Sequence, residues 1–93
     1  MGKGNESLEE LYIAENEIQN LSGLSHFARL KKIHARDNLV TKLDFEEFLT
    51  LRELKYLNLR NNQIDSLEDL KIYEMLESLE NLNLKGNFRV SIY

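Results

Sequence analysis

The hydrophobic residues of this chain follow one spacing that recurs four times. Leucine opens each block at residues 8, 30, 54 and 79, and further apolar residues follow three and five positions later. An asparagine closes each block, and these four residues are Asn16, Asn38, Asn62 and Asn87. Successive blocks begin 22, 24 and 25 residues apart. A period of this length indicates a solenoid, in which short repeats stack on one another and bury a shared core.

Each block predicts a short β-strand, because its second and third apolar residues lie two positions apart. Side chains two positions apart point to the same side of a strand, whereas a helix places them on different faces. We expect four parallel strands near residues 10–14, 32–36, 56–60 and 81–85, stacked about 4.8 Å apart. The asparagine that follows each strand is predicted to bond main-chain groups in the turn, since an amide side chain both donates and accepts hydrogen bonds.

The segments between the blocks shift towards the 3.6-residue spacing of helices. Residues 44–49 and 66–73 predict short helices, and residues 22–28 predict a single helical turn. Each predicted helix starts with an N-cap residue that an acidic residue follows three positions later: Asp44 with Glu47, and Ser66 with Asp69. The predicted fold class is therefore α/β, a solenoid with four parallel strands on the concave face and short helical turns on the convex face.

The pattern resembles the leucine-rich repeat family, most closely its intracellular subclass with 22-residue units. The consensus of that subclass is Leu-x-x-Leu-x-Leu-x-x-Asn-x-Ile-x-x-Leu. Residues 54–67 match it at every defined position, and residues 8–21 match with Ile13 at the third apolar place. The resemblance covers residues 8–87 and implies a role in binding proteins. It implies no particular partner, because the subclass includes phosphatase regulators, dynein light chains and spliceosomal subunits.

One domain is expected, because 93 residues leave room for no more. We expect a flexible N-terminal segment at residues 1–7 and a repeat array at residues 8–93. The array divides into repeats 8–29, 30–53, 54–78 and an incomplete repeat 79–93. End repeats expose apolar surface because they lack a neighbour on one side. We therefore expect the chain to be part of a longer array or to self-associate through its uncapped ends.

The composition argues against catalysis. The chain has no cysteine and only two histidines, His26 and His34, so no zinc site of ordinary spacing can be drawn. Its four glycines are scattered, which excludes a glycine-rich phosphate loop. Carboxylate pairs such as residues 46–47 fall on predicted outer helices, where they lack the cleft that acid–base chemistry needs. We expect no enzyme activity, no cofactor and no bound metal.

The composition also suggests where the protein works. No apolar run approaches the roughly 20 residues that cross a bilayer, so no membrane partner is expected. The absence of cysteine favours a reducing compartment. We therefore expect a cytoplasmic protein, with nuclear and ciliary locations left open.

Aligning the repeats predicts which side chains line the concave face. The third, fifth and seventh places of the blocks point away from the core, and these twelve positions hold four bases and one acid. With the second and eighth places added, the count becomes six bases and five acids, a local charge of +1. Tyrosine and arginine are enriched at protein interfaces. The predicted partner-binding residues are Tyr12, Lys32, His34, Arg36, Tyr56, Asn58, Arg60, Asn83 and Lys85.

These positions favour a protein–protein interaction module or scaffold that binds an acidic or polar partner on the concave face. One alternative is an architectural fragment of a longer repeat array without a ligand of its own, because any exposed sheet face must carry polar side chains. Another is an RNA-binding surface on which Tyr12 and Tyr56 stack bases. The sequence argues against nucleic acid, since it lacks the wide basic stripe that phosphate contacts demand.

Overall fold

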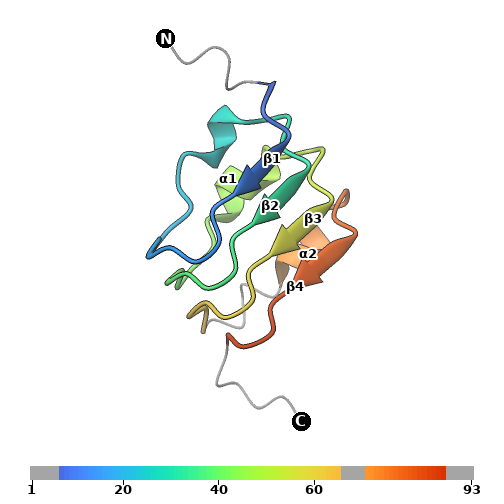
Figure 1. The fold of residues 1–93 in the computed structure, drawn as a ribbon. Coiled ribbons are helices and arrows are strands. Elements are labelled where there is room, and N and C mark those ends of the chain that lie inside the picture. The colour runs from blue at the N-terminus through green and yellow to red at the C-terminus, as the bar shows by residue number, and fades with distance from the viewer. Residues whose placement is uncertain (1–6, 66–70, 88–93) are drawn as a thin grey trace.

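Four parallel strands form a single sheet in the order β1-β2-β3-β4 in the computed structural model, which describes residues 7–65 and 71–87. The strands are β1 (Glu10–Tyr12), β2 (Lys32–His34), β3 (Tyr56–Asn58) and β4 (Asn81–Asn83). Figure 1 shows them side by side, with the helical elements behind the sheet. The α/β solenoid with four parallel strands expected from the sequence is therefore confirmed.

The strands pair in the register that the repeats predict. Tyr12 pairs with His34, His34 with Asn58, and Asn58 with Asn83, so equivalent places of successive repeats lie beside one another. Each strand is three residues long rather than the five expected. Main-chain hydrogen bonds nevertheless continue past the strand ends, as in the 2.9 Å bond from Ile13 N to His34 O. The prediction of strand position is confirmed, and only the strand length was wrong.

A left-handed residue turns the chain three positions after each strand ends. The eighth place of every block has a positive φ, and its occupants are Glu15 (61°), Asp37 (59°), Asn61 (57°) and Gly86 (81°). A strand requires a negative φ, so the chain must turn at this place. Left-handed backbone is costly for residues other than glycine. Asp37 and Asn61 have short polar side chains that tolerate this conformation, so Glu15 is its least favourable occupant.

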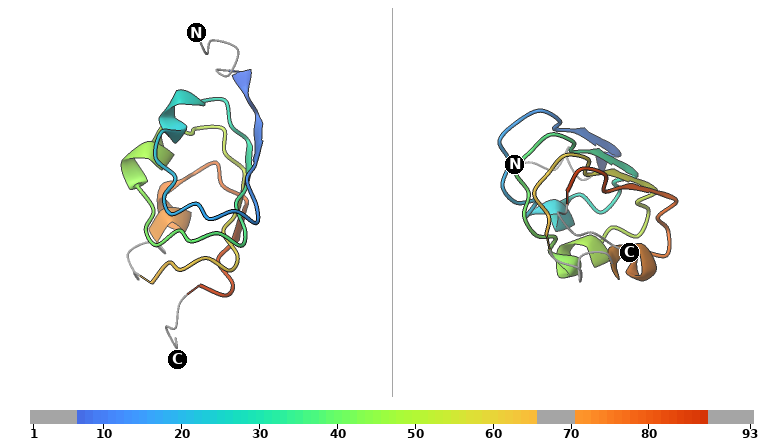
Figure 2. Two further views of the ribbon diagram at one scale, coloured as in Figure 1. Left: turned by 60° about the vertical axis from the view of Figure 1, so that its left-hand side comes forward. Right: turned by 90° about the horizontal axis from the view of Figure 1, so that it is seen from below.

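The convex side carries a 3₁₀ turn, η2 (Leu24–His26), and two short helices, α1 (Phe45–Leu49) and α2 (Ile72–Met75). Figure 2 shows these elements gathered on the side of the coil opposite the strands. Asp44 caps α1 as expected, because its carboxylate accepts hydrogen bonds from the main-chain N–H groups of Glu46 and Glu47. The predicted Ser66–Asp69 cap and most of the predicted helix 66–73 lie outside the described residues.

Glu47 does not complete a reciprocal cap with Asp44. Its carboxylate instead accepts a hydrogen bond of 2.8 Å from the main-chain N–H of Ser25, beside the preceding turn η2. This bond lowers the pKa of Glu47, since a main-chain donor stabilises the charged form of the carboxyl group. Glu47 therefore joins two neighbouring convex segments, a role that its local sequence did not predict.

The core lies between the sheet and the convex segments and is completely buried only in the middle of the array. Leu57 and Leu59 in β3 and its following turn have no exposed surface, and Phe48 of α1 is also fully buried. The equivalent residues of the two end repeats pack against this core but remain partly exposed: Leu11, Ile13, Leu82 and Leu84. Burial falls at the ends because a terminal repeat has a neighbour on one side only.

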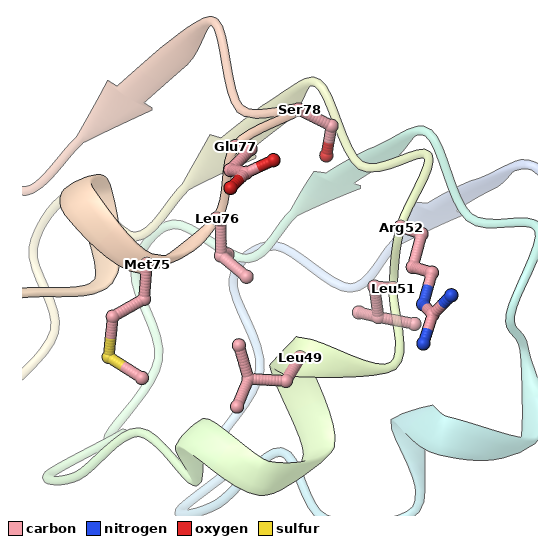
Figure 3. A pocket seen from close by; sticks show the side chains of 7 residues that line it. All are labelled: Leu49, Leu51, Arg52, Met75, Leu76, Glu77 and Ser78. Atoms are coloured by element: carbon pink, nitrogen blue, oxygen red, sulfur yellow. The ribbon is translucent and has the colours of Figure 1, made fainter.

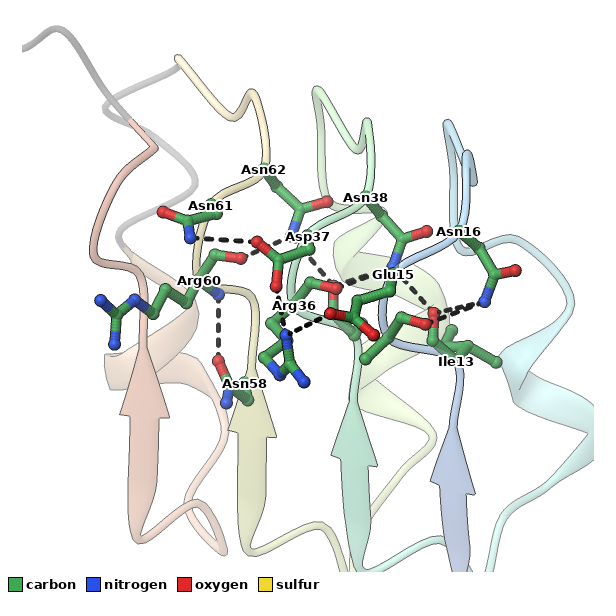
Figure 4. A network of polar contacts seen from close by, with 12 residues as sticks. Ile13, Glu15, Asn16, Arg36, Asp37, Asn38, Asn58, Arg60, Asn61 and Asn62 are labelled. Atoms are coloured by element: carbon green, nitrogen blue, oxygen red, sulfur yellow. Dashed lines mark hydrogen bonds and ion pairs between the residues drawn. The ribbon is translucent and has the colours of Figure 1, made fainter.

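The asparagines that follow the strands form the predicted ladder, and Figure 4 shows three of them, Asn16, Asn38 and Asn62. Asn62 Nδ2 donates to Ala35 O of the preceding repeat and to Leu59 O of its own, both at 3.0 Å. Its Oδ1 accepts from Val40 N at 3.0 Å. Asn38 makes the same set of contacts one repeat earlier, and both side chains are buried. Asn38, Asn62 and Asn87 thus each join their own turn to the turn before it, whereas Asn16 bonds only its own turn.

Candidate partner-binding surface

The structure brings all nine predicted partner-binding residues onto the concave side of the sheet. Six lie in strands, and Arg36, Arg60 and Lys85 lie in the turns that directly follow strands. None of the nine is buried: Tyr12, Lys32, Arg60 and Lys85 are exposed, and His34, Arg36, Tyr56, Asn58 and Asn83 are half-buried. Strand alternation predicted this common face, because places 3, 5 and 7 of each block point away from the core.

Three aromatic rings form a stack across β1, β2 and β3. The Tyr12 and His34 ring centroids lie 4.2 Å apart with nearly parallel planes, and the His34 and Tyr56 centroids lie 4.8 Å apart at an angle of 39°. The Tyr12 side chain is 66% exposed, and its hydroxyl donates a hydrogen bond to Glu10. That bond to a carboxylate raises the pKa of Tyr12. The stack therefore presents a flat aromatic surface whose position is held by its neighbours.

His34 is less accessible than its place in the repeat suggests. It lies between the two tyrosines, and its Nε2 is buried without a hydrogen-bond partner among the described residues. A buried polar atom without a partner costs free energy, which the two ring contacts must offset. His34 therefore supports the aromatic surface more than it offers its own nitrogen to a ligand.

Arg36 is engaged within the molecule. Its guanidinium contacts Glu15 Oε2 at 3.4 Å and forms a second ion pair with Asp37. Asp37 also accepts a hydrogen bond of 3.0 Å from Asn61 Nδ2, and this bond, followed by the contact with Arg36, lowers the pKa of Asp37. Figure 4 shows the guanidinium between these two carboxylates. Arg36, Arg60 and Lys85 occupy the same place in successive repeats, and the two carboxylates neutralise the first of these three cations.

Arg60 and Lys85 differ from Arg36. Among the described residues, neither forms an ion pair. In Figure 4 the Arg60 side chain extends away from the cluster around Arg36. At the seventh place of the repeats, the unpaired positive charge therefore lies towards β3 and β4, while Lys32 is a further exposed cation on β2.

A second surface feature lies on the convex side and was missed by the sequence analysis. A groove of about 310 Å³ opens between α1 and the segment after α2. Two of its apolar residues, Leu49 and Met75, are 45% and 39% exposed. Figure 3 shows the residues that line it: Leu49, Leu51, Arg52, Met75, Leu76, Glu77 and Ser78. The sequence feature that indicates this groove is an apolar residue, Leu49 or Met75, at the end of each short outer helix.

Two further properties concern only the part of the chain that the structure describes. There, no group of three or more histidine, aspartate or glutamate side chains lies close enough together to hold a metal ion. No helix within residues 7–65 and 71–87 is long and apolar enough to cross a membrane.

Comparisons with known proteins give the chain a family. A family model for leucine-rich repeats in two copies matches residues 28–72. Leucine-rich repeat-containing protein 23 of Bos taurus is 33% identical over 83% of this chain and 22% of its own length. Acidic leucine-rich nuclear phosphoprotein 32 family member A of Drosophila pseudoobscura pseudoobscura is 35% identical over 87% of this chain and 30% of its own length. The chain thus spans less than a third of either relative.

A solved structure agrees with this assignment. A chain in the crystal structure of the Drosophila melanogaster SNF/U2A′ complex superimposes with a TM-score of 0.77 and 24% identity, covering 94% of this chain and 50% of that one. At this identity the likeness concerns the fold alone. Together with the four stacked strands and the asparagine ladder, these matches show that the chain belongs to the leucine-rich repeat family, with repeats of the intracellular type.

Proposed function

We propose that this chain is a protein-interaction module that binds an acidic or polar partner segment on its concave face. The observation that carries the proposal is the pairing of an ordered aromatic surface, led by Tyr12, with the unpaired cations Arg60 and Lys85 on the same face. Aromatic side chains and arginine are the types enriched at protein interfaces. An unpaired cation also attracts a carboxylate without first giving up another ion pair.

The comparisons support the general role. The solved structure of similar fold is, by its title, a complex, and leucine-rich repeat proteins are typically interaction modules. One relative is named a nuclear phosphoprotein, and the chain contains no cysteine. We therefore propose that the module acts inside the cell, in the cytoplasm or the nucleus.

Affinity capture with charge-reversed variants tests the proposal. Arg60→Glu combined with Lys85→Glu should remove the partner from the captured proteins, as measured by quantitative mass spectrometry. Lys42→Glu combined with Arg52→Glu is the matched control, because it changes the net charge equally at exposed residues outside the concave face. Thermal melts should be nearly unchanged in both variants, since exposed charges contribute little to stability.

The opposite result would place the binding surface elsewhere. If the variant with Lys42→Glu and Arg52→Glu loses the partner while the variant with Arg60→Glu and Lys85→Glu retains it, the convex groove is the binding surface and the proposal is wrong. Glu46→Lys offers an independent convex change, because Glu46 is exposed on α1. Glu47 is unsuitable, since its carboxylate bonds Ser25 and its replacement would also disturb the fold.

Self-association is a second candidate, favoured by the partial exposure of core residues in both end repeats. Leu11 and Leu82 are half-buried, whereas Ile33 and Leu57 at the same place of the inner repeats are fully buried. A second copy placed against either end of the sheet would cover them through strand-edge pairing. Sedimentation velocity at several concentrations tests this, and a sedimentation coefficient that does not change with concentration would exclude it.

A further inference from the structure

The concave face divides into two halves that differ in charge pairing. On the β1–β2 half, two of the three cations form ion pairs: Lys31 contacts Glu9 at 3.5 Å, and Arg36 contacts both Glu15 and Asp37. The third, Lys32, forms no ion pair among the described residues, but the four acids of this half, at positions 9, 10, 15 and 37, outnumber its three bases. A carboxylate that approached Arg36 would have to compete with two carboxylates already in place.

The β3–β4 half presents hydrogen-bond donors in the same arrangement twice. Asn58 Oδ1 accepts from the main-chain N–H of Arg60, and Asn83 Oδ1 accepts from that of Lys85, each at 3.0 Å. A main-chain N–H can only donate, so the oxygen of each amide must face it and the NH₂ group must face away. Asn58 Nδ2 then donates to Tyr56 Oη at 3.2 Å, while Asn83 Nδ2 has no acceptor among the described residues.

We define the donor edge as the four residues Asn58, Arg60, Asn83 and Lys85. Their outward groups are amide NH₂, guanidinium and ammonium, all of which donate hydrogen bonds. Equivalent places of neighbouring repeats lie at the strand spacing of about 4.8 Å. Carboxylates are acceptors only, and their hydrogen bonds to charged donors are stronger than those between neutral groups. The donor edge is therefore complementary to carboxylates and not to groups that donate.

We propose that the partner segment crosses the strands in one direction, with its carboxylates on the donor edge and an apolar or aromatic side chain on the Tyr12–His34 stack. This inference rests on the proposed function and specifies the partner's chemistry. The direction follows from β1, whose flanking region, residues 9–15, carries Glu9, Glu10 and Glu15 and no base. An acidic segment placed over β1 would meet like charges, whereas the same segment over β3 and β4 meets unpaired cations.

The same acids favour protein over nucleic acid. A polynucleotide carries a negative charge at every phosphate, so a strand that crosses the whole sheet must pass over the acidic region 9–15. A protein segment can carry its acids at one end and apolar residues at the other. The exposed Tyr12 ring then packs against that apolar end.

Synthetic peptides test the direction. Crossing four strands requires about 15 Å, so a peptide of about ten residues is long enough. One end should be glutamate-rich and the other should carry phenylalanine and leucine, with a nitroxide label at either end in two versions. NMR spectra of the ¹⁵N-labelled protein should show the strongest broadening near residues 58–60 and 83–85 with the label at the acidic end. With the label at the apolar end, the strongest broadening should shift to residues 10–14.

Charge-neutralising variants test the same inference by affinity. Arg60→Gln with Lys85→Gln should weaken binding of the fluorescent peptide about tenfold, the effect of removing two exposed but unpaired cations. The matched control, Lys31→Gln with Arg36→Gln, removes two cations from the other half and should change affinity less than about twofold. Circular dichroism checks that each variant remains folded. Binding should also weaken as salt is added.

The outcomes separate this inference from the proposed function. If both variants weaken binding equally, or if the label at the acidic end broadens residues 10–14 most, binding on the concave face stands and the inferred direction is wrong. If the peptide does not bind, or broadens mainly α1 and α2, both are wrong. If an oligouridylate of similar length displaces the peptide at comparable concentration, the choice of protein over nucleic acid is wrong.

Discussion

Replacement of Asn62 by alanine should be among the most damaging single changes to this fold. Asn62 is only 5% exposed, and its Oδ1 accepts the main-chain N–H of the fully buried Val40. No other described group accepts from that N–H, so Asn62→Ala leaves it unpaired. Ala35 O and Leu59 O lose one donor each, but each of these carbonyl oxygens keeps a hydrogen bond from another asparagine of the ladder.

The magnitude follows from these separate losses. An unpaired buried N–H costs about 1–3 kcal/mol. Loss of the side chain's packing adds roughly 1 kcal/mol. We expect Asn62→Ala to lower the free energy of unfolding by about 2–4 kcal/mol, which corresponds to a fall in melting temperature of roughly 10–25 °C for a chain of this size.

Asn16→Ala is the matched control at the same place of the first repeat. Asn16 is exposed, and its Nδ2 donates to Ile13 O at 3.0 Å and Ala14 O at 3.1 Å. Its Oδ1 accepts no hydrogen bond from a described residue, so no buried donor is left unpaired. The expected cost is under about 1 kcal/mol. Urea denaturation followed by circular dichroism measures both variants, and a difference below about 0.5 kcal/mol would refute the reasoning.

Asn62→Asp tests how much the hydrogen bonds donated by the amide NH₂ group of Asn62 stabilise the fold. The carboxylate could still accept from Val40 N, but it could not donate to Ala35 O or Leu59 O and would place a charge beside two carbonyl oxygens. At neutral pH it should therefore destabilise the fold at least as much as alanine does. A milder effect than that of Asn62→Ala would mean that the donated bonds contribute little.

Two further predictions concern a turn and a carboxylate. Gly86→Ala should cost roughly 1–2 kcal/mol because Gly86 has a φ of 81°. It should cost slightly more than Gly23→Ala, because the new Cβ at position 86 would collide with Asn61 Oδ1, whereas Gly23 (φ 89°) has nothing within 4 Å. Equal costs in urea denaturation would argue against the contact. The lowered pKa of Glu47 contributes stability above its ordinary value of 4.5, and that contribution is lost as pH falls through the folded-state value. Wild type should therefore exceed Glu47→Gln in melting temperature above the ordinary pKa of 4.5, and the difference should shrink as the pH falls below it. A difference that does not vary with pH would show that the Ser25 bond does not stabilise the charged carboxyl group.

The candidate surface could be predicted from the sequence only in outline. Strand alternation placed Tyr12, His34 and Arg60 on one face, and the structure agrees. The sequence did not show that Arg36 is neutralised, because this depends on left-handed turns that bring Glu15 and Asp37 to its guanidinium. Side-chain contacts between repeats depend on the geometry of the turns, and repeat spacing alone does not contain that geometry.

The repeat spacing by itself determined the architecture of the described chain. Leucines at a fixed interval can be buried together only when successive blocks stack, so the parallel sheet, its register and the buried asparagines at positions 38 and 62 all follow from one pattern.

The tertiary structure determined the backbone conformation and the contacts of residues that are not part of the repeat pattern. In the folded chain, the eighth place of each block has a left-handed backbone, and the carboxylate of Glu47 accepts a hydrogen bond from Ser25. Arg36 forms two ion pairs, whereas Arg60 forms none among the described residues. These outcomes depend on which side chains meet between neighbouring repeats. The contacts of Ser25 with Glu47 and of Glu15 with Arg36 join residues more than twenty positions apart, so the local sequence does not contain them.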